Sequence, residues 1–277
     1  MASANHVEPK RSGWFSRLQK IVFGTGQEGN PLQIPANREL LKQSCHHIAS
    51  LLQSEGITIP ARDKEGGLLI PTTSICDIFE NLHVQKVGPI WKVIRHTFET
   101  LQNTDGSRWP HTFLLEVMCS IIKGQYSHIN ILRSEFFTVI SQAGQGDFYL
   151  PLLRLRMQAL TLLTSNGRTI APFHDEIGPL LESIVSFEEL KAAGPEGIEV
   201  FLVLVRLVIE VIKYNFTQIQ ESSMAGLIEA YSSVVQRRDV SVQIMAACIS
   251  LLDVVVRYGY FPPSCNLKVF LSALCHA

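Results

Sequence analysis

Three glycines near the N-terminus have a spacing that could bind a dinucleotide. Gly24, Gly26 and Gly29 match the pattern GxGxxG, which holds a pyrophosphate only when a strand precedes it and the N-terminus of a helix follows it. In this chain a basic amphipathic segment precedes the glycines, and Asn30-Pro31 follows them. The sequence therefore predicts a flexible linker at residues 24–29 that binds no nucleotide.

A second group, Cys45-His46-His47, contains residue types that bind zinc. It lies in residues 37–53, whose apolar spacing predicts a helix. Neighbouring residues of a helix point about 100° apart, so the three side chains cannot converge on one tetrahedral ion. We predict ordinary buried or surface histidines here and assign no metal ligand.

The adjacent carboxylates Asp175-Glu176 and Glu188-Glu189 could serve as an acid and a base. Each pair lies at the edge of a predicted helix, where its members point apart and its charge favours the helix N-terminus. The sequence contains no recognised catalytic or phosphate-binding motif. We therefore predict no catalytic residue and no cofactor. The alternative is an enzyme assembled from distant residues, which a deep polar pocket with strongly shifted pKa values would favour.

The most informative element is the apolar stretch at residues 199–214, EVFLVLVRLVIEVIKY. Its only charged residues are Glu199, Arg206, Glu210 and Lys213. At 100° per residue, their spacing places all four on one narrow ridge of a helix. The rest of the circumference is apolar, so we predict a helix buried between neighbours. A transmembrane helix, the alternative, would need about 20 residues with few charges.

Similar polar ridges recur along the chain. Polar residues at positions i, i+4 and i+7 occupy residues 116–123, 154–161 and 206–213, and a partial copy follows at 243–257. The successive offsets of 38, 52 and 44 residues bracket the ~40–47 residues of HEAT or armadillo repeats. We therefore predict an all-α fold, an α-solenoid of HEAT/armadillo-like antiparallel helix pairs in which one helix of each pair carries the ridge.

Aligned ridges would form a track of mixed charge that matches the charged e and g positions of a coiled coil. A solvated ridge without a partner is the alternative. The candidate partner-binding residues are Glu116, Lys123, Arg154, Gln158, Arg206, Glu210, Lys213 and Arg257.

Apolar spacing and cap residues predict further helices, which define one solenoid over residues 37–277. They are expected near residues 37–53, 75–86, 89–101, 109–124, 127–142, 147–165, 175–186, 197–215, 217–236, 239–258 and 263–276. Asn166-Gly167 is predicted to stop one helix in the left-handed conformation, and Asp239 to begin another. Residues 56–71 are predicted to form an ordered loop or a weak hairpin. Residues 186–196 are predicted to be a solvated linker, with a docking loop as the alternative.

Composition narrows the cellular setting. The 24 Lys and Arg nearly balance the 25 Asp and Glu, so no global field favours nucleic acid. The six cysteines are dispersed without a CxxC pair, which favours reduced thiols over disulfides or zinc. The N-terminus lacks the apolar core of a secretion signal. We predict a cytoplasmic protein.

Residues 1–36 are predicted to be a flexible tail with a short helix. Residues 10–23 combine four basic residues with an apolar side. Such a segment could contact an anionic membrane peripherally, cap the first repeat, or stay disordered. The last residues end in mid-pattern, without the polar cap of a solenoid, so we expect this chain to be part of a longer protein.

Four segments of the predicted solenoid resemble the N-terminal domain of the tuberin family. Shared features include the Phe136-Phe137 pair, the Asn166-Gly167-Arg168 turn, and an aromatic-Pro break after a Val-rich helix. The segments that carry the resemblance are residues 131–140, 156–170, 201–215 and 240–275, and they occur in the family's order. The resemblance covers about residues 115–277 and extends weakly to residues 14–24.

The resemblance implies a role that periodicity alone could not. Tuberin proteins are long helical scaffolds whose C-terminal GTPase-activating domain acts on Rheb and restrains TOR signalling, and their N-terminal part associates with the coiled-coil protein hamartin. No position here can be matched to the catalytic asparagine of that domain. The resemblance thus implies a non-catalytic scaffold that binds a hamartin-like coiled coil. The alternatives are a HEAT-type adaptor unrelated to tuberin and a membrane-recruitment module using residues 10–23.

Overall fold

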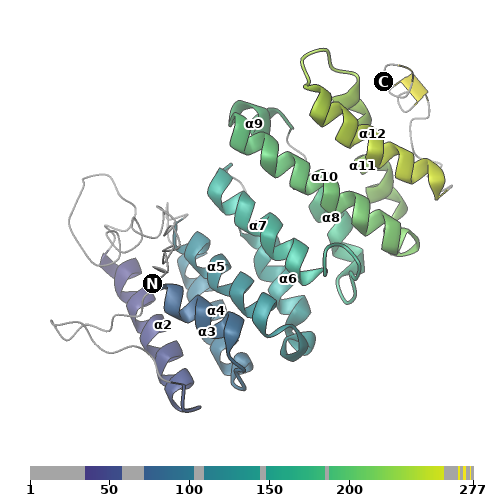
Figure 1. The fold of residues 1–277 in the computed structure, drawn as a ribbon. Helices are drawn as coiled ribbons and strands as arrows, with labels where there is room; N and C mark the ends of the chain where they lie inside the picture. The colour runs from purple at the N-terminus through teal and green to yellow at the C-terminus, as the bar shows by residue number, and fades with distance from the viewer. Residues whose placement is uncertain are drawn as a thin grey trace, which may run out of the picture.

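The protein is a stack of α-helices (Figure 1). The computed structural model describes residues 35–57, 72–102, 109–143, 148–184 and 187–258, with isolated positions 268, 271, 272 and 275. Its elements are α2 (Pro35–Gln53), α3 (Thr72–Asn81), α4 (Val87–Gln102), α5 (Trp109–Gly124), α6 (Arg133–Gln142), α7 (Leu150–Leu163), α8 (His174–Ile184), α9 (Phe187–Ala192), α10 (Pro195–Asn215), α11 (Glu221–Val235) and α12 (Val242–Arg257). Three short 3-10 turns are η2 (Tyr126–His128), η3 (Asn130–Leu132) and η4 (Phe216–Gln218).

The helices form two layers. One layer is a continuous row in which α3 contacts α5, α5 contacts α7, α7 contacts α10, and α10 contacts α12. In the other layer α2 packs on α4 and α8 packs on α11. Stacked aromatic rings link α4, α6 and the start of α8 within this second layer. The ring centres of Trp91 in α4 and Phe136 in α6 are 3.9 Å apart, and those of Phe137 in α6 and Phe173 just before α8 are 4.4 Å apart.

Successive helices alternate between the layers and pack as antiparallel pairs. Contacts join α4 to α5, α6 to α7 and α11 to α12, as short connections between neighbouring helices require. The described residues contain no strand. The predicted all-α solenoid of helix pairs is therefore confirmed.

The central helix α10 shows why this sequence forms such a stack. Pro195 is in its first turn, where the missing N–H costs nothing. Its apolar residues are buried on both flanks, with Phe201, Leu204 and Val208 fully inside the core. The prediction of a buried helix is confirmed, and none of the described helices is long and apolar enough to span a membrane.

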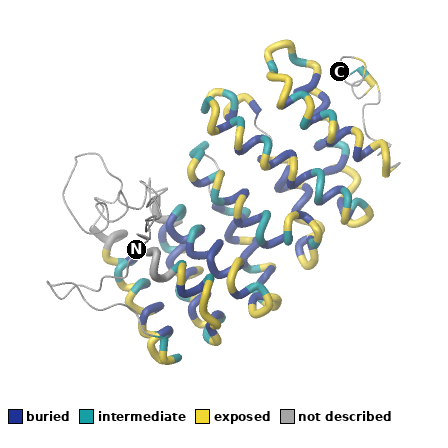
Figure 2. Tube along the Cα trace, in the orientation of Figure 1, coloured by how far each residue is buried: buried dark blue, intermediate teal, exposed yellow. Residues whose placement is uncertain are grey.

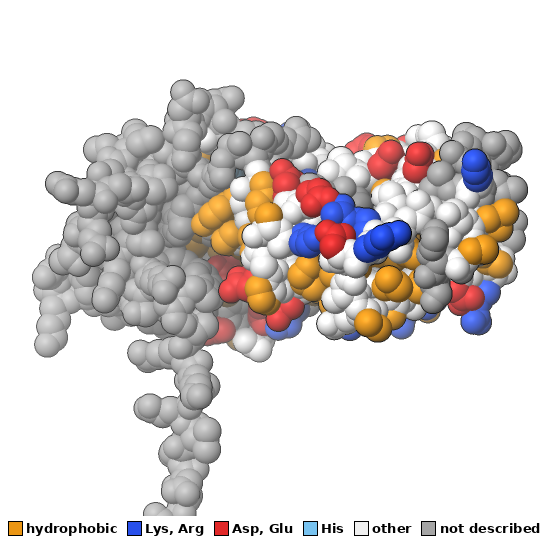
Figure 3. Space-filling model, turned by 90° about the horizontal axis from the view of Figure 1, so that it is seen from above, with side chains coloured by type: hydrophobic (Ala, Val, Ile, Leu, Met, Phe, Trp, Pro, Cys, Tyr) orange, Lys and Arg blue, Asp and Glu red, His pale blue; other side chains and the backbone are white. Residues whose placement is uncertain are grey.

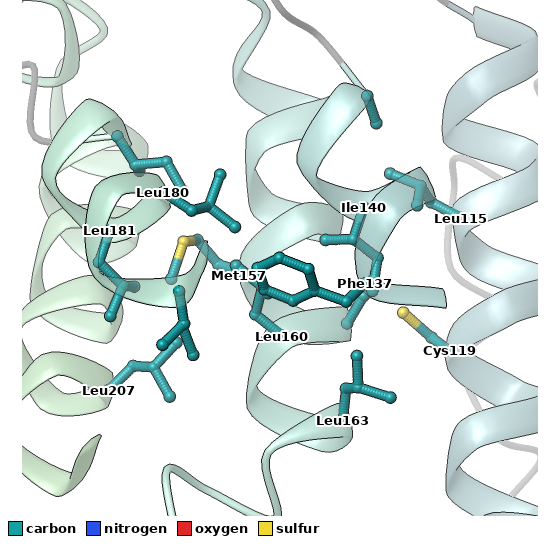
Figure 4. Close-up of a cluster of buried hydrophobic side chains, with 14 of the residues drawn as sticks. Leu115, Cys119, Phe137, Ile140, Met157, Leu160, Leu163, Leu180, Leu181 and Leu207 are labelled. Carbon is teal, nitrogen blue, oxygen red and sulfur yellow. The ribbon is translucent and has the colours of Figure 1, made fainter. Parts of the chain in front are cut away.

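One continuous apolar core runs between the layers (Figure 2). Figure 4 shows how side chains from α5 to α10 share it: Phe137 of α6 and Leu160 of α7 face Leu181 of α8 and Leu207 of α10. Each helix alone exposes an apolar flank, so burial between neighbours supplies most of the stabilisation.

Several sequence predictions about local structure were wrong. The helix expected at residues 75–86 ends at Asn81. The expected helix at residues 127–142 begins only at Arg133, because the two 3-10 turns η2 and η3 form the connection between α5 and α6. The expected linker at residues 186–196 instead contains α9. Phe187 and Leu190 anchor α9 in the core, and a side chain at Gly197 would collide with the Leu190 carbonyl oxygen, which lies 1.9 Å from the ideal Cβ position.

Several other predictions lie outside the described residues. They concern the glycine pattern at residues 24–29, the amphipathic segment 10–23, residues 58–71 of the loop or hairpin, and nearly all of the final helix at 263–276.

Candidate interaction surface

The four helices predicted to carry polar ridges, α5, α7, α10 and α12, are consecutive members of one layer. Arg154, Gln158, Arg206 and Arg257 are exposed on them, as is Lys123. The remaining candidates, Glu116, Glu210 and Lys213, are partly buried. We call these eight residues the seam. The structure thus brings the seam helices side by side.

The α5 end of the seam is engaged within the chain. Lys123 Nζ donates to Glu80 Oε2 of α3 at 2.5 Å, and Ser120 Oγ donates to Glu80 Oε1 at 3.3 Å. Ser120, the middle position of the predicted ridge, is only 4% exposed. Burial raises the pKa of Glu116 to about 7. Because its polar groups are buried or paired within the chain, this end has fewer groups available to bind a partner than the rest of the seam.

The seam continues from α7 to α10 through a charge cluster. Arg154 of α7 lies with its Nη2 atom 3.4 Å from Glu199 Oε2 and 3.9 Å from Glu196 Oε2, both on α10. All three side chains are at least half exposed, so the pairs contribute at most ~1 kcal/mol each. A partner could therefore exchange these contacts at low cost.

The second half of α10 carries more positive charge. Lys213 Nζ donates to Glu210 Oε1 at 2.8 Å, and this carboxylate raises the pKa of Lys213. On α12, Arg257 Nε donates to Asp253 Oδ2 at 2.7 Å. Arg206 is exposed and makes no ion pair with any residue that the structure describes. It is the seam cation most available to an external carboxylate.

The turn after α7 lies directly beside this half of α10. Ser165, Asn166 and Gly167 have φ values of 50°, 59° and 81°, which confirms the predicted left-handed stop. An added Cβ at Gly167 would lie 2.8 Å from Glu210 Cβ and from Val211 N. Only glycine combines this conformation with so close an approach to α10.

Three hydrogen bonds that involve side chains help to fix the turn. Gly167 N donates to Thr164 Oγ1 at 2.9 Å, and the buried Asn215 Nδ2 donates to Gly167 O at 2.8 Å. Ser165 Oγ donates to Tyr126 OH at 2.9 Å. The sequence predicted the turn but not these supports, because Asn215 and Tyr126 lie about 40 or more residues away in the chain.

Two buried arginines were also missed. Arg133 Nη2 donates to Leu163 O at 2.9 Å and to Thr169 O at 3.3 Å, so it caps the end of α7. Arg156 donates from Nε to Ile140 O at 3.0 Å and from Nη2 to Ser141 O at 3.1 Å, at the end of α6. Burial lowers the pKa of Arg156 to about 10, so its guanidinium stays charged at neutral pH. These arginines are structural caps.

The linker predicted at residues 186–196 joins a surface ion-pair group. Arg237 pairs with Glu188 of α9, and donates from Nε to Asp239 Oδ1 at 3.1 Å; Lys191 also pairs with Asp239. Asp239 was predicted to begin a helix, but Ser241 is the N-cap of α12, accepting from Ile244 N at 3.4 Å. Viewed from this end, acidic and basic side chains lie side by side (Figure 3). The group ties α9 to the turn before α12.

The Cys-His-His group and the paired carboxylates do not assemble into a metal site within the described ranges. Cys45 is partly buried, while His46 and His47 are exposed, and His46 Nδ1 contacts Lys42 O at 2.7 Å. In the part of the chain that the structure describes, no three His, Cys, Asp or Glu residues are grouped so as to hold a metal ion. Asp175 and Glu176 lie in the first turn of α8, as predicted.

These features define a helical-repeat solenoid with a polar seam along one layer. Residues 72–277 match the family model of the domain of unknown function DUF3384, so the chain belongs to that family. The match begins where α3 begins. No curated protein matched.

Among solved structures, the chain is similar to the structure of the TSC2 N-terminus, with a TM-score of 0.56 and 22% sequence identity. The similarity covers 73% of this chain and 54% of the TSC2 chain, so this chain spans about half of that structure. At this identity the likeness shows a shared helical fold.

Proposed function

We propose that this chain is a non-catalytic protein-interaction scaffold of a tuberin-like subunit, and that its seam binds a hamartin-like coiled coil. The observation that carries the proposal is the placement of the ridge helices α5, α7, α10 and α12 in one row. Charged side chains of both signs on that row suit the charged e and g positions of a coiled coil. The similarity to the N-terminus of TSC2, or tuberin, supports the same class.

The cellular role proposed with it is participation in a cytoplasmic complex that restrains Rheb and TOR signalling. In that complex the chain would position its partner, and GTPase activation would belong to a different domain. The dispersed cysteines and balanced charge support this setting over nucleic-acid binding.

Co-purification with the coiled-coil region of hamartin tests the proposal. Arg154→Glu and Arg206→Glu each reverse an exposed cation of the seam and should weaken binding, most at low salt, where exposed charges are least screened. Arg238→Glu is the matched control, because Arg238 is an exposed arginine on the turn before α12 and is not one of the seam residues. Absence of binding by the unaltered chain would contradict the proposal. Equal affinities for all variants would show that the partner binds a surface other than the seam.

The competing adaptor and membrane functions have their own readouts. A HEAT-type adaptor unrelated to tuberin would not bind hamartin at all. Recruitment to membranes through residues 10–23 would make liposome flotation depend on that segment. Flotation that survives deletion of residues 1–30, or no flotation of either form, would exclude it.

A further inference from the structure

The turn after α7 is a rigid platform that adjoins the seam. Three consecutive residues, Ser165 to Gly167, adopt the left-handed conformation, which L-residues visit at a cost of about 1–2 kcal/mol each. Hydrogen bonds from Asn215 and to Thr164 and Tyr126 hold the turn. A surface fixed in this way loses little conformational entropy when a partner binds to it.

The platform presents side chains that the fold leaves uncovered. Asn166 and Arg168 are exposed, and the Arg168 guanidinium lies 5.8 Å from the centre of the Tyr214 ring. Tyr214 itself is 54% exposed. Since Gly167 touches α10 at Glu210 and Val211, Arg168 and Tyr214 adjoin Lys213 of the seam. Arginine beside an exposed aromatic ring is typical of the residues that dominate binding energy at interfaces.

The charge of this region is positive. The turn and the second half of α10 carry three cations, Arg168, Arg206 and Lys213, and one carboxylate, Glu210, which is paired with Lys213. Among the described residues, neither Arg168 nor Arg206 has an acidic partner within an ion-pair distance, whereas Arg154 has two. An acidic surface would therefore complement this end of the row.

We propose that the turn patch, consisting of Asn166, Arg168, Arg206, Lys213 and Tyr214, docks an acidic segment of the protein partner. This proposal rests on the proposed function. It adds that the part of the seam beside the turn after α7 contributes most of the binding energy, and that the partner surface there is acidic. Arg168 and Arg206 meet carboxylates of the partner. Tyr214 packs against the apolar part of the same segment, and the fixed turn sets the register.

The test compares two turn-patch variants that leave the seam residues unchanged. Arg168→Glu reverses a cation, and Tyr214→Ala removes the exposed ring. Their matched controls are Arg238→Glu, another exposed arginine, and Ile131→Ala, which truncates an apolar side chain that is 94% exposed on a different turn. All four side chains project from the surface, so thermal unfolding followed by circular dichroism should be nearly unchanged and confirms that each variant folds.

Affinity for the coiled-coil region of hamartin is measured by titration calorimetry at low and high salt. Each turn-patch variant should lose about 10-fold or more in affinity, as interface anchors do, and Arg168→Glu should also reduce the salt dependence. Both controls should stay within about twofold. Tyr214→Phe, which keeps the ring, should bind like the unaltered chain.

The outcomes separate this inference from the proposed function. If the unaltered chain binds and Arg206→Glu weakens binding, while Arg168→Glu and Tyr214→Ala do not, the turn patch is wrong and the function stands. If the unaltered chain does not bind, both fall. If the two variants lose flotation with vesicles of phosphatidylserine and phosphatidylcholine but keep their affinity for the coiled coil, the patch faces a membrane, and the inference is overturned.

Discussion

Replacing Gly167 with alanine should destabilise the protein more than the same change at a left-handed glycine that has open space around it. The new methyl group would lie 2.8 Å from Glu210 Cβ and from Val211 N, about 1 Å inside normal contact. Relieving that overlap requires the turn to move away from α10, at a cost of about 1–3 kcal/mol. The left-handed conformation adds about 1–2 kcal/mol. Gly167→Ala should therefore lose about 2–5 kcal/mol in all.

Gly56 provides the matched control. It follows α2 with φ of +78°, close to the +81° of Gly167, and an added Cβ would meet nothing within 4 Å. Gly56→Ala should then show only the conformational cost, about 1–2 kcal/mol. Urea unfolding followed at 222 nm gives the free energies, with an unchanged slope showing that the exposed surface is the same. Equal losses for the two variants would refute the claim that close packing of the turn on α10 requires glycine.

Three further changes test the buried polar groups. Arg156→Met should lose about 2–4 kcal/mol in urea unfolding, because it removes two hydrogen bonds from a charged donor to the end of α6; a loss under ~1 kcal/mol would show that the cap is dispensable. Burial raises the pKa of Glu116 from 4.5 to about 7, so the free energy of unfolding should fall as pH rises between these values. Glu116→Gln should remove that fall and stabilise the protein by about 1 kcal/mol above pH 7, and a pH profile that is unchanged in the variant would contradict this origin. Tyr231→Phe should raise the midpoint of thermal unfolding, because the fully buried Tyr231 hydroxyl has no hydrogen-bond partner among the residues that the structure describes and an unsatisfied group costs about 1–3 kcal/mol; a lowered midpoint would show that the hydroxyl is satisfied in solution.

Long, strongly periodic helices were predictable from the sequence. The four charges of residues 199–214 fall on one ridge whatever surrounds them, so the buried faces of α10 followed from spacing alone. The same reasoning predicted that one helix of each pair carries a ridge. It could not show that Ser120 is buried, since that depends on how closely α3 packs on α5.

Short elements and buried charges were not predictable in this way. α9 is only six residues long, and its sequence, FEELKA, is typical of a solvated linker. Only the structure shows that Phe187 and Leu190 are buried in the core. Arg133 and Arg156 look like surface residues of amphipathic helices, and only the neighbouring helix ends reveal them as caps. Arg168 and Tyr214, which carry the turn patch, are 46 residues apart, so no local pattern joins them.

We expect one face of the stack, the row containing α7 and α10, to receive the partner. Hydroxyl-radical footprinting of the chain with and without the hamartin coiled coil tests this claim most directly. Tyr214 should be protected when the partner is bound, while Ile131, on the turn before α6, should keep its reactivity. Protection of Ile131 with unchanged reactivity at Tyr214 would contradict it.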